Sequence, residues 1–265
     1  MSRSPPRRLL RRLLGAIALV FVLPVTGGVA SHLLHDRPVD WRTARRDSSG
    51  MAPDPARTRD AVIQVYAARA FRWRGAFGVH TWIAVKPSGG RHYTRYEVMG
   101  FGLRHGGSAV RIHGGTPDAY WFGNRPELLR ELRGGETVDA LITRIDRAAR
   151  NYPYDTRYRV WPGPNSNTFV AWIAREVPEL ALDLPPTAIG KDYLPSDQWL
   201  STAPSGRGLQ ISLGGLIGLI VAPEEGVEIN LLGLAAGLDF SPPALKLPGL
   251  GRIGPSAEPA LPHSR

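Results

Sequence analysis

The segment from Val160 to Val170, VWPGPNSNTFV, places three small polar residues directly before an apolar run with helical spacing. Asn165, Ser166 and Asn167 therefore stand at the expected start of a helix, where a side-chain oxygen can cap the first-turn N–H groups. The same place suits a nucleophile, because the helix dipole favours negative charge at the N-terminus. The segment predicts either a structural cap or a catalytic serine at Ser166.

His80 is a second candidate, because it lies in a strongly apolar segment, FGVHTWIAV, that predicts a strand. A histidine there must either satisfy both ring nitrogens by hydrogen bonds or take part in chemistry. Glu97 belongs to the next predicted strand, on the face that it shares with Tyr93 and Arg95. If the two faces coincide across the hairpin, the Glu97 carboxylate orients the His80 imidazole. The alternative is a structural His80 and a solvated Glu97.

The composition excludes several classes of site. The chain has no cysteine, which excludes disulfides, thiolate metal sites and a cysteine nucleophile. No metal-binding motif such as H-E-x-x-H occurs, so we expect neither a metal nor a cofactor. The net charge is +10, but five arginines lie within residues 3–12 and no block of five basic residues follows, so we expect no nucleic-acid partner. Trp161, beside Pro-Gly-Pro, is expected at the mouth of a substrate pocket with Asn165 and Asn167.

Alternating and helical patterns indicate the elements that position these residues. Strands are expected over 61–69, 75–87, 92–101 and 108–115, and helices over 125–135, 136–153 and 167–178. The fold class is therefore α+β, with an antiparallel sheet packed against a small helical group. Residues 206–240 predict a long glycine-rich β-hairpin around the turn at 223–226. It is expected to lie flat against the sheet or against a membrane surface, and the first is the more ordinary arrangement.

The N-terminus combines a basic head, RSPPRRLLRRLL, with the apolar stretch GAIALVFVLPVTGGVA. The pattern fits an uncleaved anchor or a cleaved signal segment equally well, with Gly28 to Ala30 as the cleavage site. The arginines place the N-terminus in the cytoplasm, so we expect a single-pass inner-membrane protein with its C-terminal domain outside, or a periplasmic protein after cleavage.

The expected division of the chain follows from these patterns. Residues 1–35 form the anchor or signal segment, and residues 36–60 form a polar linker. Residues 61–240 form a single α+β domain, and residues 241–265 form an irregular tail rich in proline and glycine.

The segments GVHTWIAVKP, YEVMGF and GPNSNTFVAWI occur in an order that resembles circularly permuted papain-like hydrolases of the NlpC type. Together with AIGKDYLPS, they resemble more closely an uncharacterised bacterial family, a domain of unknown function of membrane-anchored envelope proteins, over roughly residues 60–240. The resemblance implies that His80 is the general base, Glu97 its orienting group, and Ser166 the substitute for the usual cysteine. First-turn N–H groups would then form an oxyanion hole. A serine hydroxyl is far harder to ionise than a thiol, so the resemblance speaks more for the fold than for the chemistry.

Two functions follow from these patterns. The first is a membrane-tethered hydrolase or acyltransferase that acts on amide or ester bonds of peptidoglycan peptides, lipoproteins or lipids, and it requires Ser166 within hydrogen-bond reach of His80. The second is an inactive envelope module that binds cell-wall fragments, lipid or a partner protein, in which Ser166 only helps to start its helix.

Overall fold

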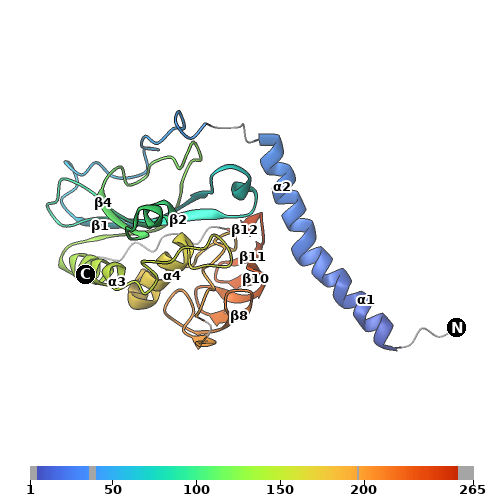
Figure 1. The fold of residues 1–265 in the computed structure, drawn as a ribbon. Helices are drawn as coiled ribbons and strands as arrows, with labels where there is room; N and C mark the ends of the chain where they lie inside the picture. Colours follow the sequence, from blue (N-terminus) through green and yellow to red (C-terminus); the bar gives the residue numbers. More distant parts are fainter. Residues whose placement is uncertain (1–4, 36–39, 196, 256–265) are drawn as a thin grey trace.

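The computed structural model describes residues 5–35, 40–195 and 197–255. It begins with a continuous helical segment made of α1 (Pro5–Ile17), the π-helical turn η1 (Ala18–Val22) and α2 (Leu23–His35). Within it, Arg8–Leu34 is long and apolar enough to cross a membrane, and a signal sequence has the same properties. In Figure 1 this helical rod extends away from the rest of the molecule.

A five-stranded antiparallel sheet forms the centre of the body. Its strands are β1 (Ala61–Arg69), β2 (Val79–Lys86), β3 (Thr94–Val98), β4 (Val110–Gly114) and β5 (Glu127–Gly134), in the order β4-β3-β2-β1-β5. Two short 3-10 helices, η2 (Arg72–Ala76) and η3 (Gly100–His105), lie in the connections. The strands predicted over 61–115 are confirmed, because apolar alternation there marks two buried faces.

Helices cover only one face of this sheet. α3 (Glu136–Arg150) and α4 (Ser166–Glu176) pack against it, and the short η4 (Pro178–Leu180) follows α4. Ile83 and Val85 of β2 point to this side and share a hydrophobic core with Ile145 of α3 and Phe169 of α4. The helices predicted over 136–153 and 167–178 are therefore confirmed as the helical group of an α+β fold.

The opposite face of the sheet is covered by irregular chain from residues 46–53 and 116–124. Trp82 and Ala84, the neighbours of Ile83, pack there with Tyr66 in a second apolar cluster. The Asp118 carboxylate ties the two covering segments together, because it accepts hydrogen bonds from the Ser48 hydroxyl and from the N–H groups of residues 51 and 52. The expected linker thus supplies part of the cover of this face, although it holds no named helix or strand between residues 40 and 60.

The helix expected over 125–135 is wrong, since these residues form the edge strand β5. Leu, Glu and Arg have good helix propensity, but β1 offers a free edge, and Ala61 to Ala67 pair with Gly134 to Glu127. Tertiary pairing outweighs a local preference of this size.

The C-terminal residues form a second antiparallel sheet. Its strands are β6 (Leu200–Ser201), β7 (Leu209–Leu213), β8 (Ile217–Ala222), β9 (Gly226–Leu231), β10 (Leu234–Phe240), β11 (Pro243–Leu247) and β12 (Gly251–Ile253), each beside the next along the chain. The predicted turn at 223–226 is present between β8 and β9. Each arm of the expected hairpin folds back once more, however, and the expected irregular tail contains the strands β11 and β12. Residues 256–265 lie outside the described part of the chain.

Candidate functional site

Asn165 caps α4 and is fully engaged in doing so. Its Oδ1 accepts hydrogen bonds from the N–H groups of Asn167 (2.9 Å) and Thr168 (3.2 Å), while the Thr168 hydroxyl accepts from the Asn165 N–H (3.1 Å). The Asn165 amide also donates to the carbonyl oxygens of Val160 and Ile189. This reciprocal arrangement is a capping box, and it satisfies two N–H groups that the helix cannot pair internally.

Asn167 fastens the start of α4 to the sheet. Its Nδ2 donates to the carbonyl oxygens of Val79 (3.1 Å) and Ile189 (2.8 Å). Its Oδ1 accepts a hydrogen bond from the Thr81 hydroxyl at 2.9 Å. All these partners belong to the protein itself, so the buried amide of Asn167 has a structural role.

Ser166 is the first residue of α4 and is only 4% exposed. The Thr81 hydroxyl donates to its main-chain oxygen at 3.3 Å. Within the described part of the chain, the Ser166 side chain makes no hydrogen bond, and the N–H groups of the two following residues already bond Asn165. No described residue hydrogen-bonds the hydroxyl to activate it, and two first-turn donors for an oxyanion, the N–H groups of Asn167 and Thr168, are occupied.

The structure does not bring Ser166 and His80 together. Thr81 faces α4, and successive side chains of a strand point to opposite faces of the sheet, so His80 points away from the helix. His80 lies with Trp82 on the other face, where its ring stacks on Trp121 with 3.7 Å between the centroids. The expected Ser166–His80 pair is therefore not formed, because the helices cover the face occupied by Thr81.

Glu97 and His80 do meet, as their strand positions suggested. The Glu97 carboxylate is 2% exposed and accepts hydrogen bonds from His80 Nε2 (3.1 Å), Arg95 Nη2 (3.0 Å) and His113 Nε2 (2.8 Å). The Arg95 guanidinium also lies over the Trp82 ring, 4.6 Å from its centroid. Sequence reasoning missed Arg95 and His113 as partners, although Arg95 shares the predicted face and the β3–β4 register places His113 opposite it.

The charges of this cluster follow from its contacts. Burial acts to raise the pKa of Glu97, but the hydrogen bonds from His113 and His80 and the charge of Arg95 outweigh it and hold that pKa well below its usual range. The hydrogen bond to Glu97 raises the pKa of the partly exposed His113. Burial lowers the pKa of His80 in spite of the same carboxylate. The cluster thus consists of an ionised glutamate held by an arginine and two histidines.

Trp161, expected at a pocket mouth, instead contacts the second sheet. Its indole N–H donates to the carbonyl oxygen of Leu232 at 2.9 Å, in the turn between β9 and β10. Gly233 in that turn has a φ of +80°, and a Cβ there would lie 2.9 Å from Trp161 Nε1, so both the turn and the indole require glycine. Trp161 therefore fastens the loop before α4 to the second sheet.

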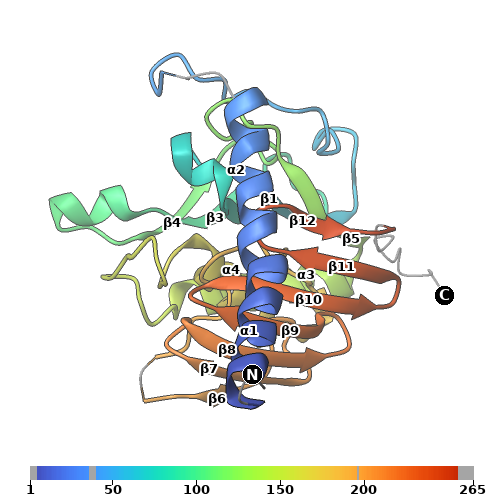
Figure 2. The same cartoon turned by 90° about the vertical axis from the view of Figure 1, so that its right-hand side faces the viewer.

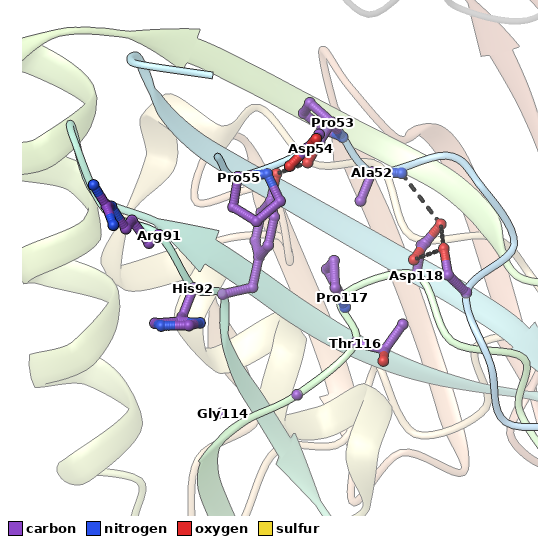
Figure 3. Close-up of a pocket in the computed structure, with 13 residues that line it drawn as sticks. Ala52, Pro53, Asp54, Pro55, Arg91, His92, Gly114, Thr116, Pro117 and Asp118 are labelled. Atoms are coloured by element: carbon purple, nitrogen blue, oxygen red, sulfur yellow. Dashed lines mark hydrogen bonds between the residues drawn. The ribbon is translucent and has the colours of Figure 1, made fainter. Parts of the chain in front are cut away.

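An open pocket of about 620 Å³ (Figure 3) is lined in part by Tyr93, which packs with Trp82 on the face of the first sheet opposite the helices. Pro53, Pro55, Tyr93 and Thr116 contribute to its walls. The Arg95 guanidinium donates to the carbonyl oxygen of Thr116, which links the wall of the pocket to the Glu97 cluster. Neither Trp161 nor the two asparagines of α4 line this pocket, so the expected substrate-binding residues are not gathered around it.

A third polar group, at the inner face of the second sheet, was missed from the sequence. Lys191 donates to Asp192 and Glu228, and Lys246 donates to Asp183 (2.7 Å) and Glu228 (2.9 Å). The signal was present in the composition, since the chain has only three lysines among many arginines. All three, including Lys86, are at most 1% exposed. Among the side chains that the structure describes, no group of three or more histidines and carboxylates could hold a metal ion.

The comparison with protein families identifies the body of the chain. The family described as "Protein of unknown function (DUF3750)" matches residues 60–193, from the residue before β1 to just beyond Lys191 and Asp192. No curated protein and no solved structure matches the chain. The match covers half of the sequence and confirms the resemblance to an uncharacterised domain family. The chain therefore belongs to the DUF3750 family of proteins of unknown function.

Proposed function

We propose that this protein is a membrane-tethered binding module of the cell envelope and not a serine hydrolase. The observation that carries the proposal is the placement of Ser166 and His80 on opposite faces of the five-stranded sheet. A base can activate a hydroxyl only from within hydrogen-bond reach. The β2 side chain that hydrogen-bonds the first residues of α4 is the Thr81 hydroxyl, which is no base at neutral pH.

The layout of the domain supports a relationship to permuted papain-like hydrolases without their catalytic pair. The strand with His80 precedes the strand with Glu97, and α4 follows and packs its first turn against β2. In this proposal the polar residues at the start of α4 have become structural. Asn165 and Asn167 use their side chains to hold the helix, and Ser166 occupies the position of the nucleophile without a partner.

The N-terminal segment supports the tethering. Arg8–Leu34 is the one helix of sufficient length and apolarity in the described part of the chain. The arginines that precede its apolar core favour a cytoplasmic N-terminus, which places the two sheets outside the cytoplasm. The inner membrane is then the site of action, and cleavage of the segment would release the same body into the periplasm.

The open pocket is the best supported ligand site of such a module. Pro53 and Pro55 supply rigid, half-buried apolar surface, which suits a peptide or a sugar ring, and Thr116 adds an exposed side chain with a hydroxyl. The Asp118 carboxylate is occupied by the covering segments and takes no part in recognition. We therefore assign cell-wall fragments as the ligand class of this pocket.

A fluorophosphonate probe tests the absence of catalysis. We expect no labelling of the full-length protein in detergent, and no difference between it, Ser166→Ala and His80→Ala, while an added serine hydrolase in the same tube is labelled. Labelling that Ser166→Ala and His80→Ala both abolish would overturn the proposal and restore the hydrolase.

Binding is tested with soluble muropeptides and the full-length protein, measured by calorimetry. Thr116→Trp should fill the pocket and weaken binding by an order of magnitude or more, because its side chain is exposed at the wall. Arg147→Trp is the matched control, since Arg147 is exposed on α3 at the other side of the sheet. Equal affinities for the two variants would exclude this pocket as the ligand site.

A further inference from the structure

The second sheet presents a continuous apolar surface on the side away from the body. The register of its strands places apolar side chains opposite one another across all the long strands. We call this surface the outer face; its large exposed members are Leu209, Ile211, Leu213, Ile217, Leu219, Val221, Ile229, Leu238, Phe240, Leu245 and Ile253. Leu213 is 59% exposed and Phe240 is 64% exposed, so these side chains are not a core.

The polarity of this sheet is the reverse of that of an ordinary antiparallel sheet, which buries apolar residues and exposes polar ones. Gln210, Ser212, Glu228, Asn230 and Lys246 alternate with the outer face and are all buried against the body. In the described strands β7 to β12, no outward-pointing residue is charged. Such a pattern is expected when the outside of the sheet meets an apolar medium.

The outer face is about as large as the largest apolar patch of a typical soluble protein. Seven strands at about 4.8 Å spacing and roughly 17 Å in length give a projected area on the order of 500 Å². The largest apolar patch of a protein is often functional, so its place beside the apolar N-terminal helix and its freedom from charge carry the argument more than its area.

The apolar N-terminal helix runs in front of this face. In Figure 2 the helical segment lies in front of the second sheet, while Figure 1 shows that α1 extends away from that sheet. Phe21 is buried, and η1 contacts β10. A Cβ on Gly28 would lie 2.9 Å from the carbonyl carbon of Gly249, so α2 and the β11–β12 turn meet backbone to backbone. The segment that enters the bilayer therefore departs directly from the outer face.

The backbone of the sheet is compatible with lipid. Each interior strand is hydrogen-bonded on both sides, so its N–H and C=O groups need no water. The two edge strands, β6 and β12, are two and three residues long, which leaves few unpaired groups at the rims.

We propose that the outer face is a lipid-contact surface, which lies against the acyl chains and the inner edge of the headgroup region of the membrane that the N-terminal helix enters. The proposal rests on the membrane anchoring included in the proposed function, but it is independent of the pocket and of the inactivity of Ser166. In this arrangement the sheet lies on the membrane surface, in addition to the helix that anchors the protein in the membrane. Contact with lipid explains why the side chains opposite one another on this face are uniformly apolar.

Site-directed spin labelling of the full-length chain in phosphatidylethanolamine–phosphatidylglycerol vesicles tests the proposal. The chain has no native cysteine, so single cysteines can be placed without background. Labels at Leu219→Cys and Ile229→Cys probe the outer face, Arg147→Cys is the exposed control on α3, and Leu19→Cys reports on the helix. The readout is the accessibility of each label to oxygen, which concentrates in lipid, and to a water-soluble nickel chelate.

We expect the oxygen-to-nickel accessibility ratio at residues 219 and 229 to exceed that at residue 147 several-fold and to approach the ratio at residue 19. Outer-face labels as accessible to nickel as residue 147 would overturn the proposal in favour of a solvated sheet. Labels inaccessible to both reagents would overturn it in favour of a second copy or another protein. A high oxygen-to-nickel ratio at residue 19 but not at residues 219 and 229 would refute the lipid-contact surface and leave the membrane anchoring intact. A low ratio at residue 19 would refute the membrane anchoring itself.

Discussion

The helix-covered side of the first sheet and the inner side of the second sheet bury opposite kinds of side chain. The first sheet places Ile63, Ile83 and Val85 against α3 and α4, and this core is formed by apolar contacts. The second sheet turns Lys246, Glu228 and Asp239 toward the body and its apolar residues outward. The helix-covered side of the first sheet therefore has an apolar core, whereas the second sheet buries polar and charged side chains and leaves large apolar ones exposed.

This difference determines which interactions each region depends on. Burial of hydrocarbon is favourable in itself and tolerates small changes of shape. Buried ions are tolerated only while each has its partners, because removal from water costs several kcal/mol per ion. The Lys191–Asp192 pair lies at the end of the segment that matches the family and reaches into the second sheet. The ion pair between Lys191 and Glu228 thus connects the segment that matches the family to the second sheet.

The largest expected effect comes from breaking the charged group of the second sheet. Lys246→Met leaves Glu228 and Asp183 without their shared cation, which should reduce the free energy of unfolding by about 3–5 kcal/mol. Chemical unfolding of the full-length protein in detergent measures this change. Arg147→Met is the control and should stay within about 0.5 kcal/mol. A Lys246→Met variant as stable as its control would mean that the second sheet is held together by other contacts.

The second prediction compares apolar side chains on the two sheets. Ile83→Ala removes fully buried hydrocarbon from the first core and should cost about 2–4 kcal/mol. Leu219→Ala removes a side chain of similar size from the outer face, and in detergent it should cost less than about 1 kcal/mol. The same unfolding measurement serves both variants. Equal losses would show that Leu219 belongs to a packed core and would contradict the contrast between the sheets.

The third prediction concerns pH and Glu225, which accepts a hydrogen bond from the Ser205 N–H. Burial raises the pKa of Glu225 from its ordinary 4.5 to about 7. Between these values the folded protein keeps a proton that the unfolded chain has released, so stability falls as the pH rises through this window and levels off above it. The total change is at most about 3 kcal/mol.

Glu225→Gln isolates this contribution. Its stability should lack the decrease between about pH 4.5 and pH 7, and subtraction of the two curves removes the contributions of other groups such as His113. If the free energy of unfolding depends on pH in the same way in the wild-type protein and the variant, Glu225 is ionised throughout this pH range. The group of Lys191, Lys246 and Glu228 then tolerates another negative charge.

Much of the first sheet could be predicted, because alternation identifies strands such as Ala61–Arg69 without knowledge of their neighbours. The pairing of His80 with Glu97 followed from the same alternation. What alternation cannot give is which face the helices cover, and that choice places Thr81, not His80, beside Ser166. Only the central turn of the second sheet could be predicted, because its strands are short and separated by glycine turns, and because alternation does not show whether an apolar face is buried or exposed.

The smallest expected change in stability distinguishes a structural helix cap at Asn165 from a functional hydroxyl at Ser166. Asn165→Ala removes the cap and two further hydrogen bonds to main-chain carbonyls, and should cost about 2 kcal/mol. Ser166→Ala removes a hydroxyl that bonds no described residue, and should change the free energy of unfolding by less than about 0.5 kcal/mol.

Because these neighbouring residues are equally buried, the difference between them isolates the value of the cap, and the unfolding curves of the two variants measure it. A Ser166→Ala variant as unstable as Asn165→Ala would show that the hydroxyl has a partner inside the protein. If Ser166→Ala is as stable as the wild-type protein, the start of α4 is held by the side chains of Asn165 and Asn167 and not by the Ser166 hydroxyl.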